Sequence, residues 1–171
     1  MKKSSGYTLL ELLITVALIA LVMAIGIPAM TTFTQNDRLI TQINTLTGHL
    51  ALARSEAVKR AQQVSVCVSN SGIDCTGGTA WENGWIVYVD ENSDGSFTAG
   101  EEILRAQQTL QGGNTLTPAT IGTEITYDYR GYVDAASVGS FSLCDIRGED
   151  YGRAISISTT GRVRKDTTIS C

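Results

Sequence analysis

A short basic segment near the C-terminal end carries the clearest chemistry in this sequence. Gly161-Arg162-Val163-Arg164-Lys165 contains three cations and no acid. We expect Gly161 to occupy a turn and Val163 to point inward, so that strand alternation sends both arginines to the same outer face. Guanidinium groups bind phosphate oxygens in pairs, and the lysine adds a third positive charge. The segment therefore predicts a surface that binds the phosphates of DNA.

Neighbouring residues in the sequence include both cations that would strengthen this basic patch and acids that would neutralise it. Three further arginines extend the basic patch if the fold gathers them: Arg130, Arg147 and Arg153. The alternative is a solvated hairpin whose arginines pair with nearby acids, namely Asp145, Glu149, Asp150 and Asp166. The formal net charge of −4 argues against a general nucleic-acid coat but not against a local basic patch.

An acidic stretch offers a second chemistry, the binding of calcium. Asp90, Asn92, Asp94 and Glu101, with Gly95, fit the spacing D-x-[DN]-x-[DN]-G-x5-E. Strands rather than helices are predicted on both sides of this loop, which favours a plain hairpin connection. Both interpretations stay open, and we predict no cofactor apart from this calcium alternative.

Two tryptophans and the single histidine are further candidates for a functional role. Trp81 and Trp85 have the flat rings on which nucleobases stack. Trp85 alternates with apolar neighbours, which favours core packing, whereas Trp81 lies in a predicted loop and stays open. His49 is expected on the solvated side of a helix. The chain has no nucleophile–base spacing and no phosphate-binding glycine loop, so we do not predict an enzyme.

The N-terminal stretch has the length and composition of a membrane span. Every residue from Leu9 to Ile27 is apolar, Gly or Ala, except Glu11 and Thr15. Such a length crosses a bilayer as one helix, and Lys2 and Lys3 before it place the N-terminus in the cytoplasm. A carboxylate in hydrocarbon costs roughly 2.5 to 3.5 kcal/mol, so Glu11 is a functional residue by hypothesis.

This N-terminal pattern resembles the class III signal of type IV pilins and pseudopilins. The resemblance implies that a prepilin peptidase cuts after Gly6, that Tyr7 is then N-methylated, and that Glu11 meets the terminal amine of a neighbouring subunit. Pro28 falls at the family's proline position, while Tyr7 stands where Phe is commonest. A secretory signal peptide or a plain membrane anchor is the alternative, but neither accounts for Glu11.

The helix is predicted to continue past Pro28 to about Ala61, because apolar residues recur at steps of three and four. This stripe comprises Leu39, Ile43, Leu46, Leu50, Ala53 and Ala57. A helix of this length spans on the order of 80 Å, so half of it is expected to extend from the domain.

After Gln63 the period changes to two, which predicts strands. These lie at residues 64–69, 85–89, 103–110, 125–133, 141–146 and 154–158. The fold class is therefore α+β and type IV pilin-like. A long N-terminal helix, anchor plus domain spine, packs against an antiparallel sheet. Residues 1–6 form the leader, residues 7–33 the transmembrane and filament-core half of the helix, and residues 34–171 the globular domain.

Four cysteines fit an oxidising compartment and allow three pairings. We choose the two local loop closures, Cys67 with Cys75 and Cys144 with Cys171. The second bond ties down the C-terminus.

Much of the chain resembles the GspH/FimT-type minor pilins and pseudopilins. The matching segments are the loop from Cys67 to Cys75, Trp85 to Asp90, Phe141 to Gly148, Gly152 to Ser158 and Gly161 to Lys165. In FimT-type members of competent bacteria a Gly-Arg-x-Arg motif binds DNA, and Gly161 to Arg164 matches that motif.

The resemblance implies a minor type IV pilin that binds extracellular DNA, without sequence preference, for uptake in natural transformation. Arg162, Arg164, Lys165 and Gly161 would form the site, with Arg147 and Arg153 as possible additions. The alternative is a structural minor pilin or a type II secretion pseudopilin that does not bind DNA. The implied partners are DNA, other pilins, the prepilin peptidase/methylase and the inner membrane. The domain would lie in the periplasm before assembly and outside the cell in the pilus afterwards.

Overall fold

The computed structural model describes residues 6–171 of the 171-residue chain. Lys2 and Lys3, on which the predicted membrane orientation depends, lie outside the described residues, as does the leader except for Gly6. The chain divides into two compact units, one that ends at Asn36 and one that spans Asp37–Cys171. A single helix, α1 (Leu9–Arg60), contributes its first half to one unit and its second half to the other.

The first unit is an exposed apolar helix. Its apolar window has a mean hydropathy of 2.7 and none of that window is buried, so it is long and apolar enough to cross a membrane. The helix begins with a local cap, because the backbone N–H of Glu11 donates to Oγ1 of Thr8 at 3.2 Å. Thr8 and Glu11 have the spacing of a capping box. The carboxylate of Glu11 thus lies in the first turn of α1, where the helix dipole favours a negative charge.

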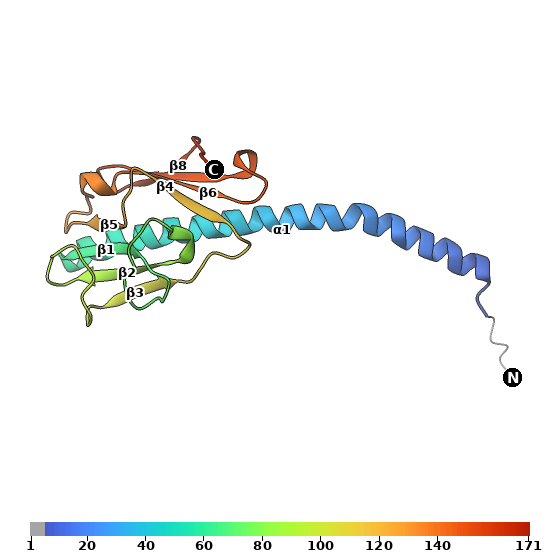
Figure 1. Cartoon of the computed structure of the whole chain (residues 1–171), viewed down its shortest axis with the longest axis horizontal. Coiled ribbons are helices and arrows are strands. Elements are labelled where there is room, and N and C mark those ends of the chain that lie inside the picture. The colour runs from blue at the N-terminus through green and yellow to red at the C-terminus, as the bar shows by residue number, and fades with distance from the viewer. Residues whose placement is uncertain (1–5) are drawn as a thin grey trace. The chain divides into compact units, whose positions relative to one another are not determined.

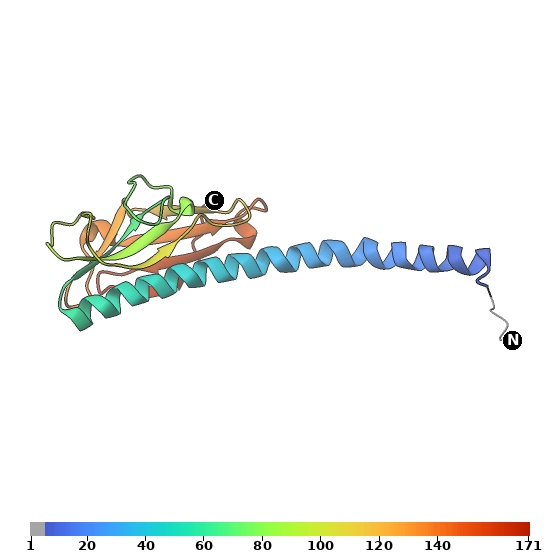
Figure 2. The same ribbon diagram turned by 90° about the horizontal axis from the view of Figure 1, so that it is seen from below.

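The second unit contains two antiparallel sheets over the C-terminal half of α1 (Figures 1 and 2). The first sheet has the order β3-β2-β1-β5, with β1 (Gln63–Val68), β2 (Trp85–Asp90), β3 (Ile103–Gln107) and β5 (Glu124–Tyr127). The second has the order β4-β6-β7-β8, with β4 (Thr115–Ala119), β6 (Gly139–Cys144), β7 (Arg153–Ile157) and β8 (Val163–Asp166). Three short 3-10 helices connect them: η1 (Trp81–Asn83), η2 (Ala135–Ser137) and η3 (Glu149–Tyr151).

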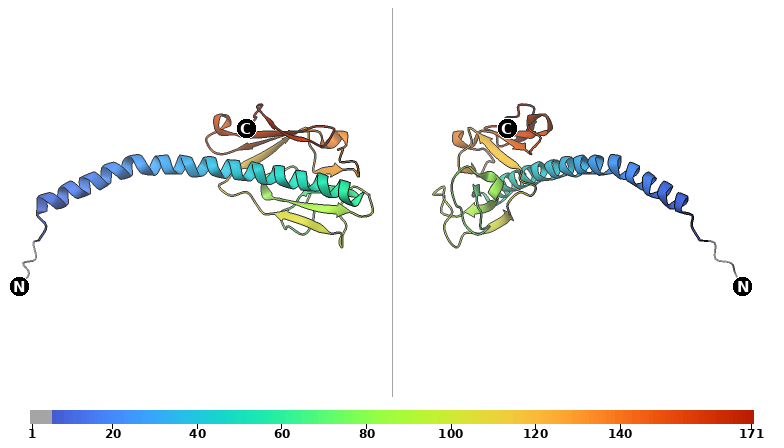
Figure 3. Two further views of the ribbon diagram at one scale, coloured as in Figure 1. Left: turned by 180° about the vertical axis from the view of Figure 1, so that it is seen from behind. Right: turned by 45° about the vertical axis from the view of Figure 1, so that its right-hand side comes forward.

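The predicted helix stripe forms the spine of the core. All six predicted residues are buried. They pack with inward residues of both sheets, and the left view of Figure 3 shows the helix lying across the near side of the two sheets. Every residue of this core lies between Leu39 and Val163, so the second unit encloses its own hydrophobic core.

Both predicted disulfides are present in this unit. Cys67–Cys75 closes the loop after β1, with Cα atoms 5.7 Å apart. Cys144–Cys171 joins the end of β6 to the C-terminus, with Cα atoms 5.8 Å apart. The α+β prediction is confirmed, with two sheets in place of the one sheet expected.

Candidate nucleic-acid interface

The hairpin between β7 and β8 positions the basic segment. Gly161 lies in a left-handed conformation, with φ +70°, and its N–H donates to the carbonyl of Ser158 at 2.8 Å. Strand β8 then pairs with β7, and Val163 packs on the core opposite Ile157. Arg162 and Arg164 are exposed. The predicted turn at Gly161 and the alternation after it are confirmed.

A second turn holds the Gly161 turn in place. A Cβ atom on residue 161 would collide with the carbonyl oxygen of Gly131. That same carbonyl accepts a hydrogen bond from Nε of Arg54, at 3.0 Å, across from α1. The absence of a side chain at Gly161 therefore lets the two turns and the helix meet closely.

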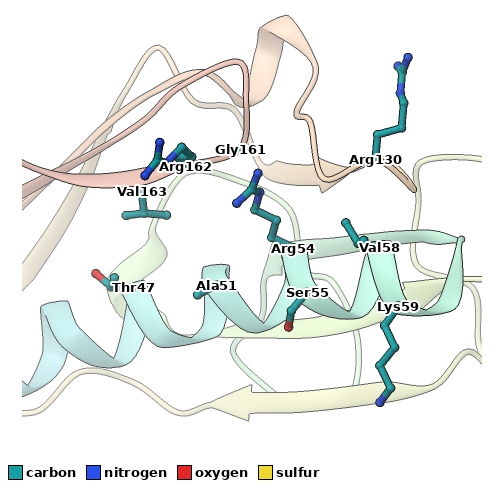
Figure 4. A pocket seen from close by; sticks show the side chains of 10 residues that line it. All are labelled: Thr47, Ala51, Arg54, Ser55, Val58, Lys59, Arg130, Gly161, Arg162 and Val163. Carbon is teal, nitrogen blue, oxygen red and sulfur yellow. The ribbon is translucent and has the colours of Figure 1, made fainter.

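A groove of about 680 Å³ lies between α1 and the start of β8. Figure 4 shows Arg54 rising from the helix toward Gly161 and Arg162, while Lys59 points away from them. The groove is lined by Thr47, Ala51, Arg54, Ser55, Val58, Lys59, Arg130, Gly161, Arg162 and Val163. Four of these residues are cationic.

A second groove, of about 620 Å³, continues along β8. It shares Thr47 and Val163 with the first groove. It is lined by Ile40, Ile43, Asn44, Thr47, Arg153, Ala154, Ile155, Val163, Arg164 and Lys165. No Asp or Glu is among the described residues that line either groove, so no acid lies among the residues around Arg162, Arg164 and Lys165, which we call the basic strip along β8.

Three of the four nearby acids, Asp145, Glu149 and Asp166, are engaged elsewhere. Arg147 holds Asp145 at 2.7 Å, and this contact lowers the pKa of Asp145. Glu149 accepts from the backbone N–H of Cys171 at 3.2 Å. The backbone N–H groups of the tail keep the pKa of Asp166 low. None of the ion pairs formed within residues 6–171 uses a cation of the predicted motif.

The candidate arginines outside the motif have different surroundings. Arg153 lines the second groove and donates to the carbonyls of its own turn. Arg130 lines the first groove but is paired with Asp128 at 2.8 Å. Arg147 lines neither groove; its side chain is mostly buried and lies over the Tyr151 ring. We therefore leave Arg147 out of the site.

Sequence reasoning missed Arg54, which the structure brings to the same groove. Its position beside the apolar stripe marked it as polar, but only the tertiary contact with Gly131 shows where its guanidinium goes.

The two tryptophans are core residues, and His49 packs against one of them. Trp81 is 0% exposed, packs edge-on against Phe141 at 5.1 Å, and donates to the carbonyl of Gly122. Trp85 is buried too and donates from Nε1 to Nδ1 of His49 at 3.0 Å. Neither indole is available to stack on a base. The expectation of a solvated His49 was wrong, because its ring is half-buried against Trp85.

The acidic loop is a hairpin connection between β2 and β3. Asp90 is buried and accepts from the N–H groups of Asp94 and Gly95. Asn92 caps the same N–H of Asp94, and Glu101 accepts from those of Glu91 and Thr98. Among residues 6–171, no group of three His, Cys, Asp or Glu side chains is suited to hold a metal ion. The calcium alternative stays a prediction, which a change in melting temperature on chelation would test.

Comparison with known proteins identifies the family to which this chain belongs. Residues 42–161 match the GspH family, described as type II transport protein GspH. The chain belongs to the GspH family. Residues 1–27 match the prokaryotic N-terminal methylation motif. No curated protein gives a significant match.

Two crystal forms of the type IV minor pilin FimU of Pseudomonas aeruginosa share the fold of this GspH-family chain. In one, the FimU chain is 22% identical, with a TM-score of 0.59, and the match covers 78% of this chain and 92% of the crystallised FimU chain. In the other, the FimU chain is 21% identical, with a TM-score of 0.56, and the match covers 75% of this chain and 92% of the crystallised FimU chain. This GspH-family chain has a minor-pilin-like fold and carries the N-terminal methylation motif. Its family and methylation motif imply other pilins and the prepilin peptidase as partners.

Proposed function

We propose that this protein is a minor type IV pilin that binds extracellular DNA, without sequence preference, for uptake in natural transformation. The observation that supports it is the strip along β8. Arg162, Arg164 and Lys165 are exposed there, take part in no ion pair formed within the described residues, and border grooves without acidic lining.

Binding of this kind rests on phosphate contacts. Paired donors of a guanidinium suit phosphate oxygens, and Arg54 and Arg153 add charge on either side of the strand. Two or three neutralised phosphates give a log–log salt slope of roughly −2 to −3 on duplex DNA. Such weak contacts gain strength when several subunits engage one DNA molecule.

In this proposal the N-terminal residues anchor the domain in the membrane and then join it to the pilus. The peptidase would cut after Gly6 and leave Tyr7 as the methylated N-terminus, and Glu11 would meet the amine of a neighbouring subunit. The domain would lie in the periplasm on a membrane anchor before assembly and on the pilus afterwards.

DNA titration of the soluble fragment from Thr34 onward, at two salt concentrations, tests this function. The fragment contains the whole core and both disulfides. Arg162→Gln/Arg164→Gln is expected to weaken binding strongly and to reduce the salt slope by about 2. Arg105→Gln, an exposed arginine on β3 away from both grooves, is the control and should change little. Binding that survives unchanged in the double variant rules out the proposed site.

A structural role without DNA is the second candidate. It is favoured by the family description, a type II transport protein, and by the FimU-like fold. A structural minor pilin or secretion pseudopilin would require α1 and the two sheets but not the paired arginines. The double variant would then assemble normally and the wild-type fragment would show no affinity for DNA at either salt concentration.

A further inference from the structure

The turn that supports Gly161 carries two exposed aromatic rings. Tyr129 is 57% exposed and Tyr132 is 49% exposed. The guanidinium of Arg130 lies over both rings, 5.4 Å and 5.5 Å from their centroids. The two tyrosines and the arginine, which we call the Tyr-Arg-Tyr turn, therefore form one preordered exposed cluster.

Hydrogen bonds hold this turn rigidly. Oδ1 of Asp128 accepts from the backbone N–H groups of Arg130 and Tyr132, both at 2.9 Å. Oδ2 accepts from Nε of Arg130, and the N–H of Gly131 donates to the Asp128 carbonyl at 2.8 Å. Arg54 anchors the turn to α1. The rings are thus presented to solvent at little further cost in conformational entropy.

The turn adjoins the basic strip. Arg130 lines the same groove as Arg54 and Arg162, and Gly131 contacts Gly161. Arg130 also lines a neighbouring depression that Tyr132 shares, together with Asp128 and Asp134. Because Asp128 pairs with Arg130 and Asp134 caps η2, this end of the strip offers exposed aromatic rings, each with Arg130 on one face, rather than free positive charge.

We propose that the Tyr-Arg-Tyr turn stacks on unpaired nucleobases, so that the site prefers single-stranded DNA to duplex. This inference rests on the proposed function. A strand whose phosphates follow Arg162 and Arg164 brings its next bases to the turn, where ring faces accept any base. In a duplex the bases are already stacked inside the helix and the tyrosines gain nothing.

The test compares an oligodeoxythymidine with a blunt duplex of the same length, each titrated with the full chain in detergent micelles. Tyr129→Leu/Tyr132→Leu keeps apolar bulk but removes the rings. We expect it to weaken binding of the single strand about tenfold and to leave duplex binding within about twofold. Tyr151→Leu is the matched control, because Tyr151 is also exposed beneath an arginine but lines neither groove. It should alter neither affinity.

Cross-linking gives an independent readout. Photolysis of a bromodeoxyuridine-substituted strand should attach it to Tyr129 or Tyr132, as identified by mass spectrometry. Equal loss for both DNA forms in the double variant, or no loss for either, overturns this inference. Duplex binding that depends on Arg162 and Arg164 but lacks any single-strand preference overturns it while leaving the proposed function intact. Failure of wild type to bind either DNA form defeats both.

Discussion

Gly131 and Gly161 meet backbone to backbone, although thirty positions separate them in the sequence. The carbonyl oxygen of Gly131 occupies the space that a side chain at 161 would need, and Arg54 clamps that oxygen from the helix. One contact thus links the first residue of the predicted DNA motif to the Tyr-Arg-Tyr turn and to α1. Gly161 is therefore needed for the packing of the two turns, whatever the arginines of the motif bind.

Substituting Gly161 by alanine is expected to destabilise the domain by about 2 kcal/mol or more. A left-handed backbone at a residue with a side chain costs on the order of 1 kcal/mol, and the clash with Gly131 adds to it. Gly113→Ala is the matched control, since Gly113 has φ +67° but open space around its Cβ position. Urea unfolding of both variants measures the difference. Equal losses would mean that the close approach contributes nothing.

Acid should weaken the contact between α1 and β2. Burial, and then the charge of Arg105, lower the pKa of His49, and its neutral Nδ1 accepts from Trp85. Below pH 6.5 an unfolded histidine takes up a proton that the folded one resists, so stability falls as the pH decreases from that point. Above pH 6.5 the contribution is fully present.

His49→Gln tests this pH dependence, because glutamine keeps an acceptor but does not titrate. Free energies of unfolding followed by tryptophan fluorescence at pH 7.5 and 5.5 should show a smaller loss in the variant than in wild type. The same loss in both proteins would assign the pH dependence to other groups.

The helix was predictable because one local rule determines it. Residues three and four apart share a face, so six apolar residues marked the buried stripe and all six are buried. Strand β4 escaped prediction because Thr115–Ala119 contains Pro118. Proline is tolerated there because β4 is an edge strand, a fact that only the sheet order reveals.

The sequence predicted the arginines of the site that lie on the strand itself, but not the residues that other segments bring beside them. Alternation within Gly161–Lys165 was enough to orient Arg162 and Arg164. Arg54 and the exposed tyrosines reach the same surface through contacts between distant segments, on which local spacing carries no information. Trp81 looked available because it lies outside a regular strand, yet η1 turns its ring into the core against Phe141.

A partly buried carboxyl should make the first sheet respond to pH in the opposite direction. Glu124 accepts a hydrogen bond from the Tyr88 hydroxyl, and burial raises the pKa of Glu124 above its usual 4.5. The folded protein therefore keeps a proton that the unfolded chain releases. The resulting contribution is present below pH 4.5 and is lost as the pH rises through the folded pKa.

Glu124→Gln removes this titration and still accepts from Tyr88. The stability of the variant relative to wild type is expected to rise between pH 4 and pH 7, as measured by urea unfolding across that range. Glu91→Gln, at an exposed position in the β2–β3 loop, is the control and should show no such trend. A constant difference at Glu124 would mean that the carboxyl ionises as freely in the fold as in the unfolded chain.

The two disulfides are expected to contribute unequally, because they close loops of different length. The chain-entropy model gives about 2.6 kcal/mol for the Cys67–Cys75 loop and about 3.6 kcal/mol for the Cys144–Cys171 loop. The second bond also holds a tail with contacts of its own, since the N–H of Ser170 donates to Oγ of Ser142 at 3.1 Å.

The double serine variant of each pair measures these contributions by urea unfolding. Losing Cys144–Cys171 should lower the free energy of unfolding more than losing Cys67–Cys75. The longer loop gains more conformational entropy in the unfolded state, and the C-terminal tail is freed as well. Strand β8 keeps its pairing with β7 in either variant, so binding through Arg162 and Arg164 should persist under native conditions. A larger loss from the short loop would contradict the entropic argument. It would indicate that the loop after β1 supports the first sheet directly.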